Sequence, residues 1–461
     1  MKFWIRFLLC AGFLGLLSSC QSTNLKNLTA KAVPFLKTNS EDAAAKIDDL
    51  AVSEIPIGKL LDKAVVEVNV DQGIRQSVRD SVGHDPEVLA LESQYKASKI
   101  SVDIATSQKD FTVSGSLYGG VEDVTDGTSG VALVVDARRL IYDGGQLDSQ
   151  ISSENLKSQS LFYSLLAKKN ESALKSTQAW IELKRYVDLS ALIGSRLGVL
   201  DPLITQLETV AEAGIGDVSQ VAAAQRTVAM IRMTETDIEG KLEQARVNYK
   251  NIFGALPKNA NFDEQTFGNK ALLNNALSKD AEAPAVVAQH FKYKSALAQL
   301  AAIQARDQYS IGFESRVQRP FGGSSRDSDE SLGVVARKTL YDGKKLESEI
   351  EYAKAQAEVQ LKSMRATYRK VIGVLNSGQE KITSLKVAIK LARKNAANAK
   401  EEIDYLRQQL IIGQSTLDSV LSAEARLYEA ESKEINFKAE LTMARLEILA
   451  SSGMLVDIFG L

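Results

Sequence analysis

The chain carries the same pattern twice at a nearly constant spacing. The segment Val135–Gly144 (VDARRLIYDG) is matched 199 residues later by Val334–Gly343 (VVARKTLYDG). Further corresponding pairs are Gly214 with Gly413, Pro86 with Pro284, and Phe111 with Tyr309, the last two at a spacing of 198. A spacing held over most of the chain indicates an internal duplication. We expect repeat 1 over 67–256, a linker over 257–282 and repeat 2 over 283–461.

Each repeat contains a helical stretch far longer than a globular core requires. The pattern is helical from Gln146 to Ala213, which corresponds to about 100 Å at 1.5 Å per residue. The thin apolar stripe among Ala, Ser, Gln, Lys and Glu predicts a water-lined coiled-coil wall. The expected helices cover 146–213 and 217–253 in repeat 1, and 345–412 and 416–451 in repeat 2. Pro202 predicts a kink or short break near 198–202 that the partner helix near 397–401 lacks.

Two strand hairpins precede the long helices, over 111–142 and over 309–341. Apolar and polar residues alternate along them, which is typical of a transmembrane β-barrel but also of any half-buried hairpin. The links 122–130 and 320–331 are rich in Gly, Ser and Asp, as loops exposed to water are. Aromatic residues stand at one shared end of the hairpins and predict an interfacial girdle. These are Phe111, Tyr142, Tyr309 and Tyr341.

The first residues read as an export signal. A basic start and an apolar run to Leu17, too short to cross a bilayer, predict a signal peptide over 1–19. The sequence Leu17-Ser18-Ser19-Cys20 resembles a lipobox, so we expect Cys20 to carry lipid at the start of a tether over 20–66. The alternative is an ordinary cleavage site with a chance cysteine. Past Cys20 no run approaches 18 apolar residues, so any membrane crossing is expected from strands.

Together, the lipobox, the paired hairpins ending in Tyr-Asp-Gly and the long helices resemble the TolC-like outer-membrane factor family. The clearest matches are 81–88, 340–343 and 413–423. The resemblance implies a homotrimer in which each subunit gives four strands to a twelve-stranded barrel, continued by a long α-helical barrel through the periplasm. It also implies a periplasmic adaptor protein and an inner-membrane pump as partners. The expected fold class is therefore mostly α with a membrane β-barrel in the outer membrane.

The family further implies that the turns between the long helices form the periplasmic tip. We expect the channel aperture at the turns that contain Gly214 and Gly413, with Asp217 and Asp418 supplying its charge. The alternative is that both aspartates only cap the returning helices. Gln220, Ser419 and Ser422 stand where the family often has carboxylates, so this chain departs from the family pattern at the expected aperture.

Nothing in the sequence indicates catalysis. The two histidines cannot build a triad or a three-histidine metal site, and no phosphate-binding glycine loop occurs, so we expect no catalytic residue, metal or cofactor. Lys and Arg total 56 against 58 Asp and Glu, so no basic surface for nucleic acid is expected. We predict a passive exit duct for small molecules or unfolded protein in a tripartite efflux or type I secretion system. The alternative is a periplasm-spanning structural or adhesive coiled-coil lipoprotein without a pore.

Overall fold

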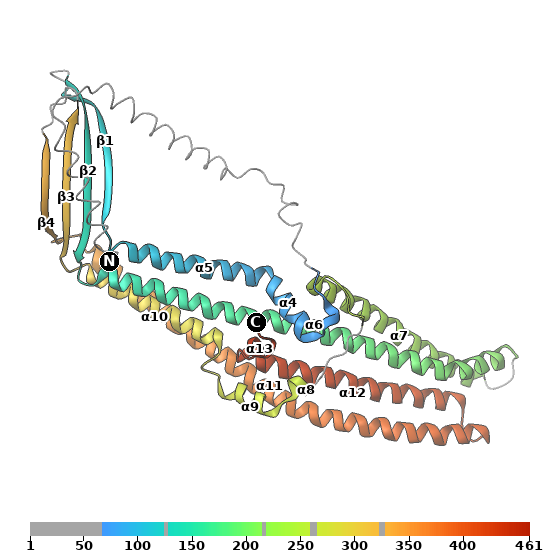
Figure 1. The fold of residues 1–461 in the computed structure, drawn as a ribbon. Helices are drawn as coiled ribbons and strands as arrows, with labels where there is room; N and C mark the ends of the chain where they lie inside the picture. The colour runs from blue at the N-terminus through green and yellow to red at the C-terminus, as the bar shows by residue number, and fades with distance from the viewer. Residues whose placement is uncertain (1–66, 124–127, 214–217, 259–264, 322–327) are drawn as a thin grey trace. The chain divides into compact units, whose positions relative to one another are not determined.

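The computed structural model describes residues 67–123, 128–213, 218–258, 265–321 and 328–461, and Val65–Leu461 form one compact unit (Figure 1). The signal peptide, Cys20 and the tether over 20–66 lie outside the described residues. Gly214 and Asp217 also lie outside them. Within the described residues, no helix is both long enough and apolar enough to cross a membrane.

The first half begins with short helices and continues through two strands into two long helices. Its elements are η1 (Val70–Gln72), α4 (Ile74–His84), α5 (Pro86–Ser107), β1 (Thr112–Asp123), β2 (Thr128–Tyr142), α6 (Gln146–Glu212) and α7 (Val218–Phe253). Asp85 caps α5 by accepting a hydrogen bond from the Glu87 amide, and Pro86 occupies the first helical position, where no amide hydrogen is needed.

The second half has the same order of main elements. It consists of α8 (Gln265–Gly268), α9 (Lys270–Ser278), α10 (Pro284–Ala305), β3 (Ser310–Phe321), β4 (Asp329–Arg337), α11 (Lys345–Ile411), α12 (Leu417–Ser451) and α13 (Leu455–Phe459). β4 ends at Arg337, four residues before Tyr341, whereas its counterpart β2 continues to Tyr142. The expected hairpin over 309–341 is therefore longer than the observed one.

The strands form one antiparallel sheet in the order β1-β2-β3-β4. The central pairing joins the two halves, because β2 from the first hairpin pairs along its length with β3 from the second. β1 and β4 are hydrogen bonded on one side only, so each leaves an open edge (Figure 1).

The Tyr-Asp-Gly motif is the turn from strand to helix. The Asp143 carboxylate accepts hydrogen bonds from the amides of Gly145 and Leu147 at 3.0 and 2.7 Å, and Gly144 has a φ of 69°. In the second half, the Asp342 carboxylate accepts from the Leu346 amide at 2.8 Å. The aspartate thus satisfies free amides at each helix start, and glycine permits the left-handed turn.

The expected break at Pro202 does not occur. α6 runs unbroken through Pro202 and has 67 residues, the same number as α11. Pro202 and Gly198, the residue four positions earlier, are both exposed. Water can therefore hydrate the Gly198 carbonyl that loses its amide partner, so the helix continues despite the proline. The sequence-based prediction was wrong because it left solvent access out of account.

The core follows α6 and α12. Trp180 on α6 is 1% exposed and contacts the rings of Tyr249 and Phe253 on α7 at centroid distances of 5.4 and 5.8 Å. α12 contributes the fully buried side chains of Leu446, Ile448 and Leu449 to the same cluster. This core holds the two halves together between the sheet and the far helical turns.

Candidate functional site

The sheet has one polar face. In an antiparallel sheet, residues paired across neighbouring strands point to the same side, and the register gives two rows across all four strands. These rows are Thr112–Arg138–Glu314–Gly333 and Ser114–Asp136–Arg316–Ser331. Ser116, Gln318 and Arg337 lie on the same side.

Ion pairs cross the strands on this face. The Arg316 Nε donates to the Asp136 Oδ1 at 2.8 Å, from β3 to β2. The Arg337 guanidinium donates to both oxygens of Glu314 at 2.6 and 2.9 Å, from β4 to β3. Both pairs are partly exposed, so they contribute little to stability but keep the charged groups aligned along the face.

The opposite face is apolar and exposed. Val113 and Leu117 on β1 are each 64% exposed, and Leu332 and Val334 on β4 are 74% and 65% exposed. The same face carries Leu133, Val135, Ile311, Phe313 and Val317. Its described ion pair, Arg319 with Glu330, lies toward the loop end. A continuous apolar surface of this kind indicates contact with lipid or with another apolar surface.

Aromatic rings gather where the sheet meets the helices. Phe111 contacts Phe313 edge to face at 5.9 Å between ring centroids, and Tyr142 contacts Tyr309 at 5.4 Å. The Arg139 guanidinium lies 5.2 Å from the centroid of the Phe111 ring. Tyr341 is not part of this group: it lies beyond β4 and is 85% exposed.

The turn between α11 and α12 contains the second set of predicted residues. Gly413 has a φ of 77°, and Gln414 donates to the Gln409 carbonyl at 2.8 Å, which closes the end of α11. Thr416 is the N-cap of α12, because its hydroxyl accepts from the Ser419 amide at 3.2 Å. The alternative in which Asp418 caps this helix is therefore wrong.

Asp418 instead joins two helices. Its carboxylate accepts a hydrogen bond from the Thr227 hydroxyl on α7 at 3.1 Å. Ser422 lies one turn further along α12 and is half-buried, and Gln220 lies in the first turn of α7. The structure thus links the start of α12 to α7, which the sequence pattern did not indicate.

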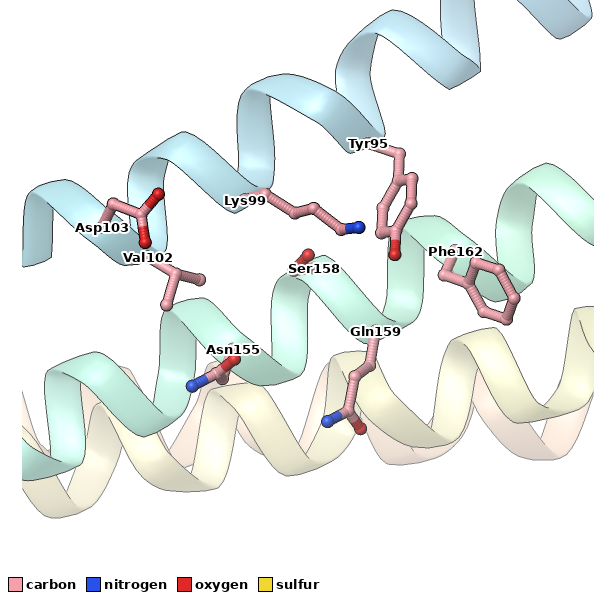
Figure 2. Close-up of a pocket in the computed structure, with 8 residues that line it drawn as sticks. All are labelled: Tyr95, Lys99, Val102, Asp103, Asn155, Ser158, Gln159 and Phe162. Carbon is pink, nitrogen blue, oxygen red and sulfur yellow. The ribbon is translucent and has the colours of Figure 1, made fainter. Parts of the chain in front are cut away.

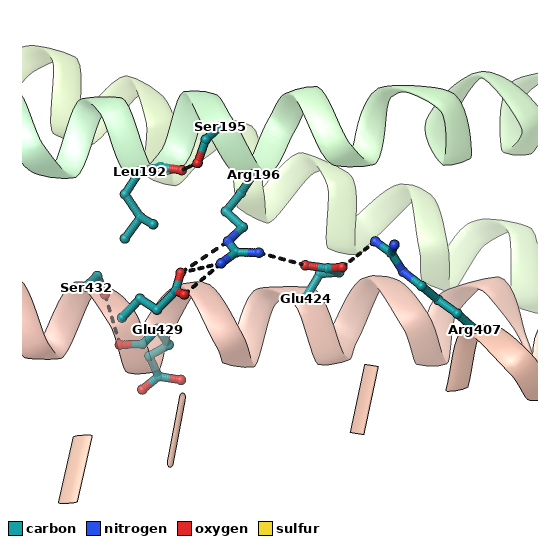
Figure 3. Close-up of polar contacts among 8 residues, drawn as sticks. Leu192, Ser195, Arg196, Arg407, Glu424, Glu429 and Ser432 are labelled. Atoms are coloured by element: carbon teal, nitrogen blue, oxygen red, sulfur yellow. Dashed lines mark hydrogen bonds and ion pairs between the residues drawn. The ribbon is translucent and has the colours of Figure 1, made fainter. Parts of the chain in front are cut away.

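A second polar link joins the two halves further along the helices (Figure 3). Arg196 on α6 donates to both oxygens of Glu431 on α12, with the shortest distance 2.6 Å, and lies 3.7 Å from Glu424. Glu424 is 2% exposed and accepts from Arg407 on α11 at 2.7 Å. A chain of charges therefore ties α6, α11 and α12 together.

A hollow of about 460 Å³ opens between α5 and α6 (Figure 2). Its lining consists of Tyr95, Lys99, Val102, Asp103, Asn155, Ser158, Gln159 and Phe162. The Lys99 ammonium lies 4.5 Å from the centroid of the Tyr95 ring, and Lys99 and Asp103 are exposed. The hollow is therefore an open groove, unlike the enclosed pockets that hold small ligands. Among the described residues, no group of His, Cys, Asp and Glu is placed to hold a metal ion.

The charged rows of the sheet and the Thr416 cap were not among the sequence-based predictions. The alternation of Glu314, Arg316 and Gln318 was the available signal for the polar face. Thr416 had the usual cap chemistry and stood two residues before Asp418.

Comparisons with known proteins agree with this architecture. Residues 272–454 match the family model described as outer membrane efflux protein. No curated protein matches the sequence.

Similar solved structures include VceC, an outer membrane protein of Vibrio cholerae, with a TM-score of 0.73 and 13% identity over 82% of this chain and 96% of that one. The MtrE outer membrane channel of Neisseria gonorrhoeae gives a TM-score of 0.68 and 13% identity over 82% and 88%. The CmeC outer membrane channel of Campylobacter jejuni gives 0.70 and 10% over 83% and 85%. The fold is that of these TolC-like channels, and the predicted resemblance is confirmed.

Proposed function

We propose that this chain, whose fold is that of the TolC-like channels, is the outer-membrane channel subunit of a tripartite efflux or type I secretion system. In this proposal it is a passive exit duct for small molecules or unfolded protein. A periplasmic adaptor and an inner-membrane pump are its partners, and Cys20 carries a lipid anchor in the outer membrane.

The observation that carries the proposal is the two-faced sheet with two open edges. One face is apolar and exposed, and the other is polar and charged, as lipid and a water-filled lumen require. Unpaired strand edges are not tolerated in hydrocarbon, because each unbonded backbone group costs several kcal/mol. Four strands are too few to close a barrel, so we propose that three copies form a twelve-stranded one.

The long helices supply the second half of the argument. α6 and α11 each have 67 residues, which corresponds to about 100 Å of helix from the sheet to the far turns. A structural rod without a pore has no need of the sheet that these helices adjoin. We also propose that the two halves arose by duplication, since the same order of elements follows the sequence spacing of 198 to 199 residues.

Planar-bilayer recording of the purified protein, together with its oligomer mass, tests this proposal. We expect discrete conductance steps from a particle of three subunits. A monomeric particle, or a trimer that does not conduct, would instead favour the structural lipoprotein without a pore.

We further propose that the turns at 214–220 and 413–422 form the narrowest ring, with Asp217 and Asp418 supplying negative charge. Acidic groups repeated around a small opening favour cations. Replacing both aspartates with Asn should lower the cation preference of single channels. Thr227→Val is the matched control, because it removes the hydrogen bond to Asp418 and leaves the charge. Unchanged selectivity in the double Asn variant would refute the charged ring.

A further inference from the structure

The two hairpins differ at the ends of their second strands. In the first hairpin, β2 continues past its last β1 partner, Arg138. Arg139, Leu140 and Tyr142 pair with β3 alone, and the register shifts between Leu140 and Tyr142. In the second hairpin, the corresponding residues 338–341 are not in a strand. Leu340 and Tyr341 are 92% and 85% exposed, whereas Ile141 and Tyr142 are 60% and 43% exposed.

The strand that would hold 338–341 is missing on that side of the sheet. On the side away from its own hairpin partner β1, β2 pairs with β3. On the side away from its hairpin partner β3, β4 has no neighbouring strand among the described residues. By the sequence spacing, β4 corresponds to β2 and β1 corresponds to β3. The neighbour that β4 lacks is therefore a β1, and the β1 of the same chain is at the far edge of the sheet.

We infer that β4 pairs with β1 of the next copy in a register that repeats the β2–β3 register, and that residues 338–341 become strand when this pairing forms. This inference rests on the proposed trimeric channel and specifies its subunit seam. Within the chain, Arg138 pairs with Glu314 and Leu140 with Gly312. Shifting the first residue of each pair by 199 and the second by 198 places Arg337 opposite Ser116, and Thr339 opposite Ser114, of the next copy.

The two faces of the sheet provide an independent check on this register. Arg337 and Ser116 both lie on the polar face, and Ala336 and Leu117, the next pair in the same register, both lie on the apolar face. A shift of one residue would place Arg337 opposite Leu117 and mix the faces along the whole seam. The inferred register therefore continues both faces from one copy to the next.

The seam also gives Tyr341 a ring partner. In the chain, Tyr142 contacts Tyr309 at 5.4 Å between ring centroids. The corresponding residues at the seam are Tyr341 and Phe111 of the next copy, and Phe111 is 55% exposed. Tyr341 would thus join the aromatic girdle on assembly and lose much of its exposure.

Cysteine cross-linking in the full-length protein tests the register. Directly opposed residues of antiparallel strands have Cα atoms about 4.5–5.5 Å apart, within the range of a disulfide. We expect the pair Thr339→Cys and Ser114→Cys to give a covalent trimer under oxidation. The matched controls are Thr339→Cys with Val113→Cys, a slip of one residue, and Thr339→Cys with Ser116→Cys, a slip of two. Both should cross-link several-fold less.

Preferential cross-linking of either control pair in a conducting trimer would overturn the inferred register and leave the channel function intact. A protein that neither conducts nor forms trimers would instead overturn the proposed function. Hydrogen exchange of the unaltered protein provides a test without cysteines. The amides of 338–341 should exchange more slowly in the trimer than in dissociated subunits, and equal exchange would refute strand formation at the seam.

Discussion

α6 and α11 have the same length and follow the same turn, yet their surroundings differ. α6 packs against α4, α5, α7, α10, α12 and α13, whereas α11 packs against α10 and α12. From residue 371 onward, the buried residues of α11 form one stripe with a seven-residue repeat: Val371, Gly378, Leu385, Ala392 and Ala399, with Leu375, Ile382, Ile389 and Ile403 beside them. This is the seam of a two-helix coiled coil. α6 is a central helix and α11 an edge helix, although each follows the second strand of its hairpin.

Buried polar groups show the same difference. α6 buries several small polar side chains that bond to its neighbours: the Ser160 hydroxyl donates to the Ala288 carbonyl at 2.8 Å, and Asn170 Oδ1 accepts from the Leu455 amide at 2.9 Å. The buried residues of α11 are apolar or glycine. The two helices therefore have the same length, whereas the position of each in the bundle decides which of its faces are buried.

The largest expected loss of stability follows from a substitution at Trp180, which tests whether α6 is the central helix. Trp180→Ala should lower the free energy of unfolding by about 3–5 kcal/mol, because it empties a fully buried site against two rings. The control, Tyr352→Ala on α11, removes an aromatic ring that is 67% exposed and should cost less than about 0.5 kcal/mol. Thermal unfolding in detergent measures both. Equal losses would show that the outer face of α11 is covered in the assembled protein.

For glycine-to-alanine substitutions, we expect the loss of stability on α11 and not on α6. An alanine Cβ at Gly378 on α11 would lie 2.8 Å from the buried Ile448 side chain, so Gly378→Ala should cost about 1–3 kcal/mol. A Cβ at Gly198 on α6 would have nothing within 4 Å, so Gly198→Ala should add up to about 1 kcal/mol of helix stability. Chemical denaturation of the two variants is the measurement. A stabilising Gly378→Ala would contradict the close packing of α11 on α12.

Removing the ion pair between Arg196 on α6 and Glu431 on α12 should lower the free energy of unfolding by an intermediate amount. Arg196→Gln removes a bidentate pair with Glu431 and leaves the buried Glu424 with Arg407 alone, at an expected cost of about 1–2 kcal/mol. Arg426→Gln provides the matched control, because Arg426 bonds to Glu402 with both side chains about half exposed, and should cost less than about 0.5 kcal/mol. If the two variants unfold alike, the Arg196 pair adds nothing beyond a surface ion pair.

The smallest effect at neutral pH is expected at Tyr249, which α6 helps to bury. Its hydroxyl has no hydrogen-bond partner among the described residues, so Tyr249→Phe should change stability by less than about 1 kcal/mol. Burial raises the pKa of Tyr249 far above its usual value near 10, because desolvation disfavours the phenolate.

The sign of this shift predicts the pH dependence. The folded state favours the protonated phenol, so its contribution to stability is complete below pH 10 and is lost as the pH rises further. Burial also raises the pKa of Tyr428 to about 12, so Tyr249→Phe should weaken the alkaline loss without abolishing it. Denaturation midpoints from pH 8 to about 11.5 measure the difference. Identical pH profiles for the unaltered protein and the variant would contradict this account.

Local signals in the sequence were sufficient to predict where the long helices begin and end. α6 and α11 each end within one residue of the range inferred from the pattern, because length, glycine and capping chemistry act locally. The alternation of Val113, Gly115 and Leu117 likewise gave the apolar face of β1 correctly.

Nonlocal relations were not accessible in the same way. No local pattern selects β3 as the partner of β2, or Glu431 as the partner of Arg196 at a separation of 235 residues. Pro202 was misjudged because its effect depends on whether the Gly198 carbonyl reaches solvent, which the sequence does not state. In the inferred seam, the end of β4 pairs with a neighbouring copy, which the sequence of one chain does not indicate.

The turn at Gly144 lies directly before the long helix α6 and sets the direction in which that helix leaves the sheet. A rotation of one degree there moves the far end of a 100 Å helix by roughly 2 Å, so small errors at the sheet are magnified at the distant turn. A Cβ at Gly144 would lie 2.5 Å from the Gln308 Cβ, which shows how closely the end of α10 holds this turn. A Cβ at Gly343, where φ is also 69°, would have nothing within 4 Å, so no such neighbour holds the turn before α11. The two helices therefore share a length but begin at turns with different surroundings, so an error at the Gly343 turn is corrected only by the packing of α11 on α10 and α12.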